Sequence, residues 1–173
     1  LSGDGLADRM YVGDMGGRVW RFDIWNGQAA SSLVTGGVNA RLGAGGIAGA
    51  PREAARRFYN APDVAIIQRR GSNPFFNLAL GSGYRGHPLE SDTQDRFYSL
   101  RDHLPFTKRT QTQYDAITPT VDGNLVDVTT NVNATLSDSS PGWKILLNDG
   151  GSWLGEKVLA ESVTVAGAIL FPT

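Results

Sequence analysis

Hydrophobic and polar residues alternate in several short stretches of this 173-residue chain, the pattern of strands that bury one face. The alternation is clearest near the start, where residues 10–13 and 18–24 flank a glycine turn. In the second of these segments Trp20, Phe22 and Ile24 fall at every second position. A period of two puts such side chains on the same face of a strand. The pattern therefore predicts a β-hairpin with Trp20, Phe22 and Ile24 on its buried face.

A second group of strands is predicted in the middle of the chain. Residues 64–69 form a mainly apolar run, and turn residues separate them from residues 75–81 and then from residues 96–102. One face of the second strand carries large apolar side chains: Phe76, Leu78 and Leu80. Three adjacent antiparallel strands with a hydrophobic face are enough to form a stable sheet. We therefore expect a three-stranded meander.

The rest of the chain is predicted to hold shorter elements between long loops. Strands are expected at residues 38–42, 124–129, 142–147 and 157–160, and as a pair at residues 162–165 and 168–171. The single helix is predicted at residues 51–59, because Pro51 suits a first helical turn and good helix formers follow it.

These elements predict a mostly all-β, single-domain chain over residues 1–173. Sheet units are expected near residues 10–25, 64–102 and 143–172, with variable loops between them. Repeated sheet units with glycine turns and aromatic anchors favour a fragment of a modified β-propeller, with antiparallel sheet blades, long loops and one short helix. Periodicity does not separate this fold from a β-sandwich, which is the alternative.

The composition narrows the functional classes. The net charge of −1 gives no basic excess for binding nucleic acid, and no apolar run is long enough to predict a membrane span. The chain has no cysteine, which excludes a disulfide framework and a thiolate metal site. Its 22 glycines and 4 tryptophans fit a protein with many short strands and tight turns.

The first eight residues predict a calcium site. Ser2, Asp4, Leu6 and Asp8 fall at every second position, with glycines between the first three. Such a loop can offer Ca²⁺ a hydroxyl, two carboxylates and the backbone carbonyl of Leu6, and Ca²⁺ prefers oxygen ligands of this kind. The alternative is a solvated turn in which Asp4 accepts hydrogen bonds from nearby backbone N–H groups.

The calcium site is expected to be incomplete in this chain. Loops of this kind usually begin with an Asp two residues before the position of Ser2, and the chain begins one residue too late to include it. The chain starts at Leu1 with neither Met nor a signal segment, and it ends directly after a predicted strand. We therefore expect it to be a piece of a larger protein.

No catalytic residue is predicted. His87 and His103 have no second histidine at a metal-ligand spacing, and no nucleophile motif accompanies them. Asp14 and Asp23 are the carboxylates that a quinoprotein-like enzyme could use. Their positions, in a turn and at a strand end, are better explained by structural hydrogen bonding.

Six segments in order resemble the C-terminal domain of the PilY1/PilC family of type IV pilus biogenesis proteins and pilus-tip adhesins. The first is Gly-Asp-Gly-Leu-Ala-Asp-Arg-Met-Tyr-Val-Gly-Asp at residues 3–14, continued by Val-Trp-Arg-Phe-Asp at residues 19–23. The others lie at residues 57–64, 81–89, 95–102, 125–129 and 155–160. The resemblance covers most of the chain.

The resemblance implies a non-enzymatic modified β-propeller at the bacterial cell surface or pilus tip, exported through the periplasm and outer membrane. It implies a role in fimbrial biogenesis, with pilus extension supported against retraction, and in twitching motility and cell adhesion. The implied partners are pilins or minor pilins and a host surface. The family's calcium loop corresponds to Ser2, Asp4, the carbonyl of Leu6 and Asp8, with Ser2 where Asn or Asp is more usual. A quinoprotein-dehydrogenase-like propeller enzyme and a passive structural propeller fragment are the alternatives.

Overall fold

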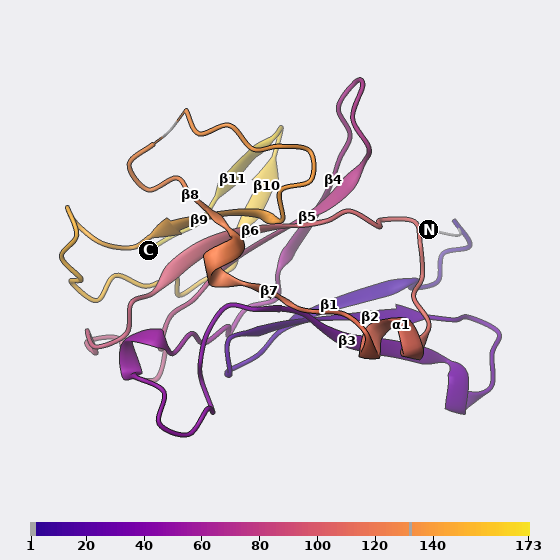
Figure 1. The fold of residues 1–173 in the computed structure, drawn as a ribbon, viewed down its shortest axis with the longest axis horizontal. Helices are drawn as coiled ribbons and strands as arrows, with labels where there is room; N and C mark the ends of the chain where they lie inside the picture. The colour runs from indigo at the N-terminus through magenta and orange to yellow at the C-terminus, as the bar shows by residue number, and fades with distance from the viewer. Residues whose placement is uncertain (1–2, 132) are drawn as a thin grey trace.

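A computed structural model of the chain describes residues 3–131 and 133–173, and these residues form three β-sheets (Figure 1). The first sheet has the strand order β1-β2-β3-β7. Its strands are β1 (Arg9–Gly13), β2 (Arg18–Ile24), β3 (Val34–Arg41) and β7 (Thr120–Val121). The predicted hairpin of β1 and β2 is confirmed as an antiparallel pair, whereas β7 runs parallel to β3.

The second sheet is the central one and has the order β4-β5-β6-β9-β8. Its strands are β4 (Asp63–Ile67), β5 (Phe75–Gly81), β6 (Arg96–Asp102), β8 (Val126–Asp127) and β9 (Gly142–Leu146). The predicted meander is confirmed as β4, β5 and β6, all antiparallel. The strand expected at residues 124–129 is reduced to the two residues of β8, which pair in parallel with β9.

The third sheet is a small hairpin of β10 (Val163–Val165) and β11 (Ala168–Leu170), as the sequence predicted. Two expectations for this part of the chain are wrong. Residues 157–160 are not a strand. In addition, β9 pairs with β6 of the central sheet, so the strands expected in one unit at residues 143–172 are divided between two sheets.

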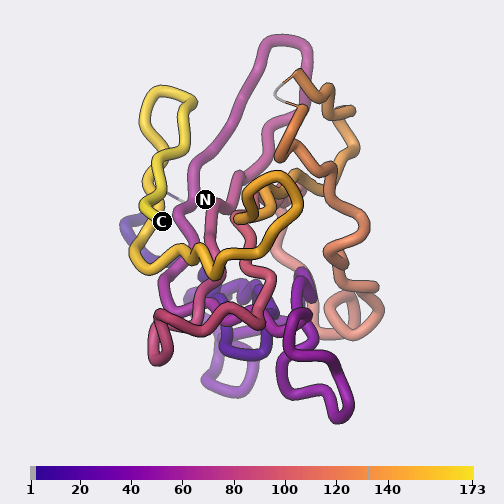
Figure 2. The backbone as a smooth tube through the Cα atoms, turned by 90° about the vertical axis from the view of Figure 1, so that its left-hand side faces the viewer, coloured from indigo at the N-terminus to yellow at the C-terminus, as the bar shows by residue number. Residues whose placement is uncertain are grey.

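The central sheet has a hydrophobic cluster on each face. The first cluster lies between the central sheet and the first sheet, and it includes Val19, Ala40, Leu42, Phe58, Phe76, Leu78, Leu80, Tyr98, Leu100 and Leu125. The second cluster includes Ala79, Phe97, Leu147 and Val158, with residues of β9 and of the C-terminal hairpin packed against it. Figure 2 shows the first sheet in the lower part of the molecule and the yellow C-terminal hairpin at the upper left. The predicted shared face of Phe76, Leu78 and Leu80 is confirmed.

The predicted buried face of β2 is wrong. Val19, Arg21 and Asp23 are buried, whereas Trp20 and Phe22 are only half-buried on the opposite face. The two charged residues can face inward because they find oppositely charged partners there, as described below. On the outer face Trp20 stacks on Phe22, with ring centroids 6.2 Å apart. The aromatic side chains therefore cover the outside of the first sheet.

The strand expected at residues 38–42 is β3, which begins earlier, at Val34, and ends at Arg41, so that it includes Gly36 and Gly37. A Cβ atom at Gly36 would lie 2.3 Å from the ring of Phe22, and one at Gly37 would lie 3.0 Å from the ring of Tyr114. These two glycines therefore let aromatic rings lie directly on the strand, one from each face.

The helix predicted at residues 51–59 is also wrong. This segment holds only the 3-10 turn η2 (Arg52–Ala54), and the chain is extended from Ala55 onward. Arg56 and Phe58 are each 3% exposed, so the segment buries alternate residues as a strand would. Phe58 belongs to the first hydrophobic cluster, and its burial there outweighs the helix propensity of residues 52–57.

Among the described residues, the α-helix lies elsewhere, at α1 (Gln111–Asp115). Thr110 caps it by accepting a hydrogen bond from the backbone N–H of Gln113, whose side chain accepts one from Thr110 in return. The remaining helical segments are the 3-10 turns η1 (Ala30–Ser32) and η3 (Asp122–Asn124). Within residues 3–131 and 133–173 no helix has the length and apolar character needed to cross a membrane.

Candidate functional site

The predicted calcium loop precedes β1, and part of it forms a turn. Ser2 lies outside the described residues. Asp4 Oδ1 accepts a hydrogen bond of 2.9 Å from the backbone N–H of Leu6. Gly3 and Gly5 have φ values of +73° and +79°, in the left-handed region that glycine adopts without strain. The loop therefore curls around Asp4 and is exposed to solvent.

Asp8 fixes the end of this loop to the first sheet. Its side chain is 6% exposed, and its Oδ1 atom lies 2.9 Å from Nζ of Lys108. Its backbone carbonyl accepts a 2.9 Å hydrogen bond from the N–H of Ile24, at the far end of β2. Lys108 also donates to the carbonyl of Ile24. Asp8, one of the two carboxylates expected to bind calcium, is thus held beside an ammonium group.

The loop has the right kind of donors for calcium, namely the carboxylates of Asp4 and Asp8 and the carbonyl of Leu6. Within the part of the chain that the structure describes, no three His, Cys, Asp or Glu residues are grouped closely enough to hold a metal ion. The predicted set contains only two carboxylates, so it depends on Ser2 and the Leu6 carbonyl as well. The sequence pattern did not predict that Lys108 lies beside Asp8. Because its charge already lies beside Asp8, a calcium ion would compete with it for that carboxylate.

A buried network of two arginines and two aspartates begins one residue after the loop. Arg9 Nε lies 2.6 Å from Asp23 Oδ1. Arg21 has both terminal guanidinium nitrogens engaged, with Nη1 at 2.7 Å from Asp102 Oδ2 and Nη2 at 3.0 Å from Asp23 Oδ2. The side chains of Arg21 and Asp23 are fully buried, and that of Asp102 is 1% exposed. The network therefore joins β1 and β2 of the first sheet to β6 of the central sheet.

Two tyrosines complete the network. Tyr11 donates a 2.5 Å hydrogen bond to Asp102, and Tyr114 of α1 donates one of 2.6 Å to Asp23. Burial, and then the charge of Asp102, raise the pKa of Tyr11 well above its usual value. Burial alone would raise the pKa of Asp23, but hydrogen bonds from Tyr114, the Arg109 N–H, Arg9 and Arg21 outweigh it and lower the pKa. The ionised form of Asp23 is therefore favoured, and it ties β1 and β2 to α1 and the segment before it.

Arg9 also binds the loop that follows β6. Its guanidinium donates to the carbonyls of Leu104 and Pro105 at 3.0 Å and to that of Thr107 at 2.7 Å. The segment that ends in Lys108 is thus held by the residue directly after Asp8. The calcium loop, the network and residues 104–108 form one continuous set of contacts.

Asp14 is fully engaged in the hairpin turn between β1 and β2. Its Oδ1 accepts from the backbone N–H groups of Gly16 and Arg18, and its Oδ2 accepts from the side chains of Arg18 and Trp20. Burial opposes ionisation, but the hydrogen bonds from Trp20 and Arg18 prevail, so the pKa of Asp14 is lowered. The hydrogen-bonding interpretation of Asp14 and Asp23 is therefore confirmed.

Sequence reasoning missed a second charged cluster around Asp122. Lys144 of β9 lies 2.5 Å from its carboxylate, Arg96 of β6 also pairs with it, and Tyr98 donates a hydrogen bond of 3.0 Å. Burial would raise the pKa of Asp122, but Lys144 and Arg96 lower it. The cluster ties the 3-10 turn η3 to the central sheet. Its residues are far apart in sequence, so no local pattern could have revealed it.

These sheets and their connecting loops define a propeller-like, all-β class of protein. No protein-family model matches the chain, and neither does any curated protein. Among solved structures, the chain is similar to the C-terminal domain of PilY1 from Pseudomonas aeruginosa, with a TM-score of 0.63 and 17% sequence identity. The match covers 97% of this chain and 41% of the solved chain. The resemblance predicted from the six segments is thus confirmed in the fold, and the chain spans 41% of the length of its solved counterpart.

Proposed function

We propose that this chain is part of a non-enzymatic, calcium-responsive protein of type IV pilus biogenesis and surface adhesion. The observation that carries the proposal is the match in fold to the PilY1 C-terminal domain over 97% of the chain. The order of the six sequence segments supports the same family. In this proposal the protein acts at the bacterial cell surface or pilus tip after export, with pilins or minor pilins and a host surface as its partners.

Calcium would act through the loop of Ser2, Asp4, Leu6 and Asp8. The ion supplies a hard positive charge that neutralises the two carboxylates. Asp8 is followed directly by Arg9, which enters the buried network, and the backbone of Asp8 is bonded to the end of β2. An ion held by the folded loop and not by the unfolded chain stabilises the fold by mass action. Calcium would therefore strengthen the junction between the first and central sheets.

The engagement of Asp14 and Asp23 supports the non-enzymatic proposal. A quinoprotein-like enzyme would need a carboxylate free to accept a proton from its substrate. Asp14 already accepts four hydrogen bonds within its turn, and Asp23 is fully buried among cations and a tyrosine. Both carboxylates are thus committed to holding the fold.

The proposal is tested by deleting the gene in the bacterium that carries it. We expect the deletion to remove surface pili and twitching motility, and the wild-type gene to restore both. A gene with Asp8→Ala is expected to restore them less well, whereas Asp92→Ala, at an exposed position, should match the wild type. Normal piliation and twitching in the deletion strain would contradict the pilus function.

A further inference from the structure

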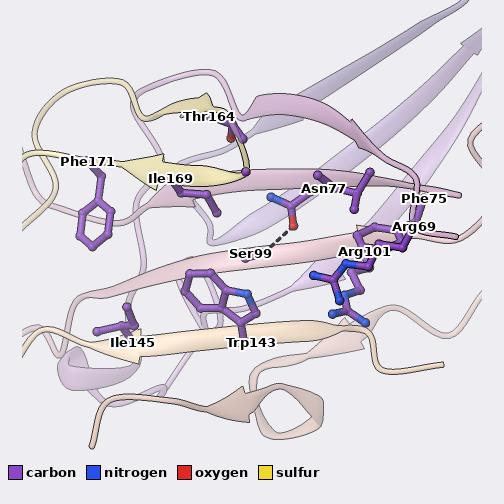
Figure 3. Close-up of a pocket in the computed structure, with 12 residues that line it drawn as sticks. Arg69, Phe75, Asn77, Ser99, Arg101, Trp143, Ile145, Thr164, Ile169 and Phe171 are labelled. Atoms are coloured by element: carbon purple, nitrogen blue, oxygen red, sulfur yellow. Dashed lines mark hydrogen bonds between the residues drawn. The ribbon is translucent and has the colours of Figure 1, made fainter. Parts of the chain in front are cut away.

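A cavity of about 260 Å³ lies between the central sheet and the C-terminal hairpin (Figure 3). Its floor is formed by β5, β6 and β9, which contribute Phe75, Asn77, Ser99, Arg101 and Trp143. The hairpin of β10 and β11 closes one side. The cavity is separate from the calcium loop, because none of its lining residues belongs to residues 3–8.

The polar groups around the cavity offer hydrogen-bond donors. Ser99 donates a 2.5 Å hydrogen bond to Asn77 Oδ1, which fixes the orientation of the Asn77 amide. Within the described part of the chain, no hydrogen bond uses the amide nitrogen of Asn77 or the indole nitrogen of Trp143. The Thr164 hydroxyl is buried and has no partner among the same residues. Buried polar groups normally find partners, so the Thr164 hydroxyl favours a ligand with hydrogen-bond acceptors, to which the N–H groups of Asn77 and Trp143 could also donate.

The cavity also carries excess positive charge. Arg101 lies over the ring of Phe75, 4.8 Å from its centroid, and donates a hydrogen bond to the carbonyl of Ser137. Arg69 lines the same cavity. Neither arginine forms an ion pair with any described residue. Burial and then the charge of Arg69 lower the pKa of Arg101, and Asp138 offsets this in part. An anionic group would relieve this repulsion.

Aromatic and aliphatic side chains supply the remaining walls. Trp143 projects from β9 beside Ser99, and Ile169 and Phe171 lie on the hairpin side (Figure 3). A flat indole surface suits the apolar face of a sugar ring, whose hydroxyls remain free for donors at the rim. Drug-sized ligands occupy roughly 300–1,000 Å³. A cavity of about 260 Å³ therefore fits a ligand of about one ring.

We propose that this cavity binds a carboxylate-bearing sugar, namely a single uronic acid residue. The planar carboxylate matches the fork of the Arg101 guanidinium, with Arg69 adding attraction at long range. Asn77 and Thr164 donate to ring hydroxyls, and Trp143 carries the ring. The inference goes beyond the pilus proposal and does not depend on calcium, so each can fail without the other.

The test is a calorimetric titration of the 173-residue chain with glucuronic acid and galacturonic acid, alongside glucose, acetate and glucose 6-phosphate. We expect saturable binding of at least one uronic acid, with the other three ligands at least tenfold weaker.

Arg101→Gln should weaken uronate binding at least tenfold. Arg69→Gln, at an exposed position, should weaken it about threefold without risk to folding. Arg52→Gln, at an exposed arginine outside the cavity, should leave it unchanged.

Several results would overturn the proposal. Absence of saturable uronate binding would do so, as would equal binding by the Arg69→Gln variant and the unaltered chain. Acetate that binds as tightly as uronate would show that the ring contributes nothing. Glucose that binds as tightly would show that the carboxylate contributes nothing. Tighter binding of glucose 6-phosphate would assign the cavity to phosphate instead.

Discussion

Replacing Arg21 by methionine is expected to lower the free energy of unfolding by about 3–5 kcal/mol, the usual cost of removing one partner from a buried ion pair. Arg21 is fully buried and binds two aspartates at once, Asp23 on its own strand and Asp102 on β6. Without it, Asp102 keeps the hydroxyl of Tyr11, the backbone N–H of Leu104 at 3.0 Å and a distant contact of 3.7 Å with Arg9, and no close cation. A buried carboxylate that is so poorly compensated destabilises the fold strongly.

Urea denaturation of the unaltered chain and of the Arg21→Met variant measures this difference in the free energy of unfolding. Arg52→Met is the matched control, because Arg52 is 81% exposed and its ion pair with Asp92 contributes little to stability. The double variant of Arg21→Met and Asp102→Asn is expected to lose less than the sum of the two single variants, since the second change removes the stranded charge. A loss below about 1 kcal/mol for Arg21→Met would contradict the structural role of the network.

Replacing Gly142 by alanine is expected to destabilise the fold by about 2–4 kcal/mol, from backbone strain and overpacking together. Gly142 begins β9 with a φ of +136°, a conformation that residues with a Cβ atom rarely adopt. A Cβ atom there would lie 2.0 Å from the carbonyl oxygen of Ser99. Because Gly142 pairs with Leu100 on β6, relief of this clash would separate β9 from the central sheet.

Gly123→Ala provides the comparison for this prediction. Gly123 lies in η3, and a Cβ atom there would meet no other atom within 4 Å. That substitution should change stability little or raise it slightly, because alanine restricts the unfolded chain. The two variants are compared by thermal melting. Similar melting temperatures for the Gly142→Ala and Gly123→Ala variants would show that the start of β9 is not as tightly packed as described.

Strand positions could be predicted from the sequence, but not which face of each strand is buried. The alternation in β2 correctly assigns its residues to two faces. It does not show which of the two faces is buried. Placing Trp20 and Phe22 inside follows the usual preference for burial of large apolar residues. The structure instead buries Arg21 and Asp23, because Asp102 comes from a strand about 80 residues later along the chain. No local pattern contains that pairing.

The two helix errors have a related cause. Residues 52–57 have good helix propensity, yet Phe58 is needed in the core and the segment becomes extended. In contrast, Thr110 and Gln113 form a capping box that could have identified α1 from sequence spacing. Even a good helix propensity gives way to long-range packing, whereas a cap acts locally and is visible in the sequence.

The candidate calcium loop was predictable from spacing, but its surroundings were not. The alternation from Ser2 to Asp8 is a local feature. Lys108 reaches Asp8 only because residues 104–107 are held by Arg9, a contact across nearly 100 residues of sequence. The same holds for the cavity below the C-terminal hairpin, whose lining comes from six strands and the segments next to them.

The measurement that tests the calcium-responsive account most directly is thermal melting of the chain in EGTA and in about 10 mM calcium. With a Kd of about 1 mM, in the weak extracellular range, calcium at this concentration adds about 1.4 kcal/mol of stability. For a chain of this size the account predicts a rise in Tm of about 3–6 °C. The rise should disappear in the Asp8→Ala variant and persist in the Asp92→Ala variant. An unchanged Tm in calcium, or an equal rise in the Asp8→Ala variant, would contradict the calcium site.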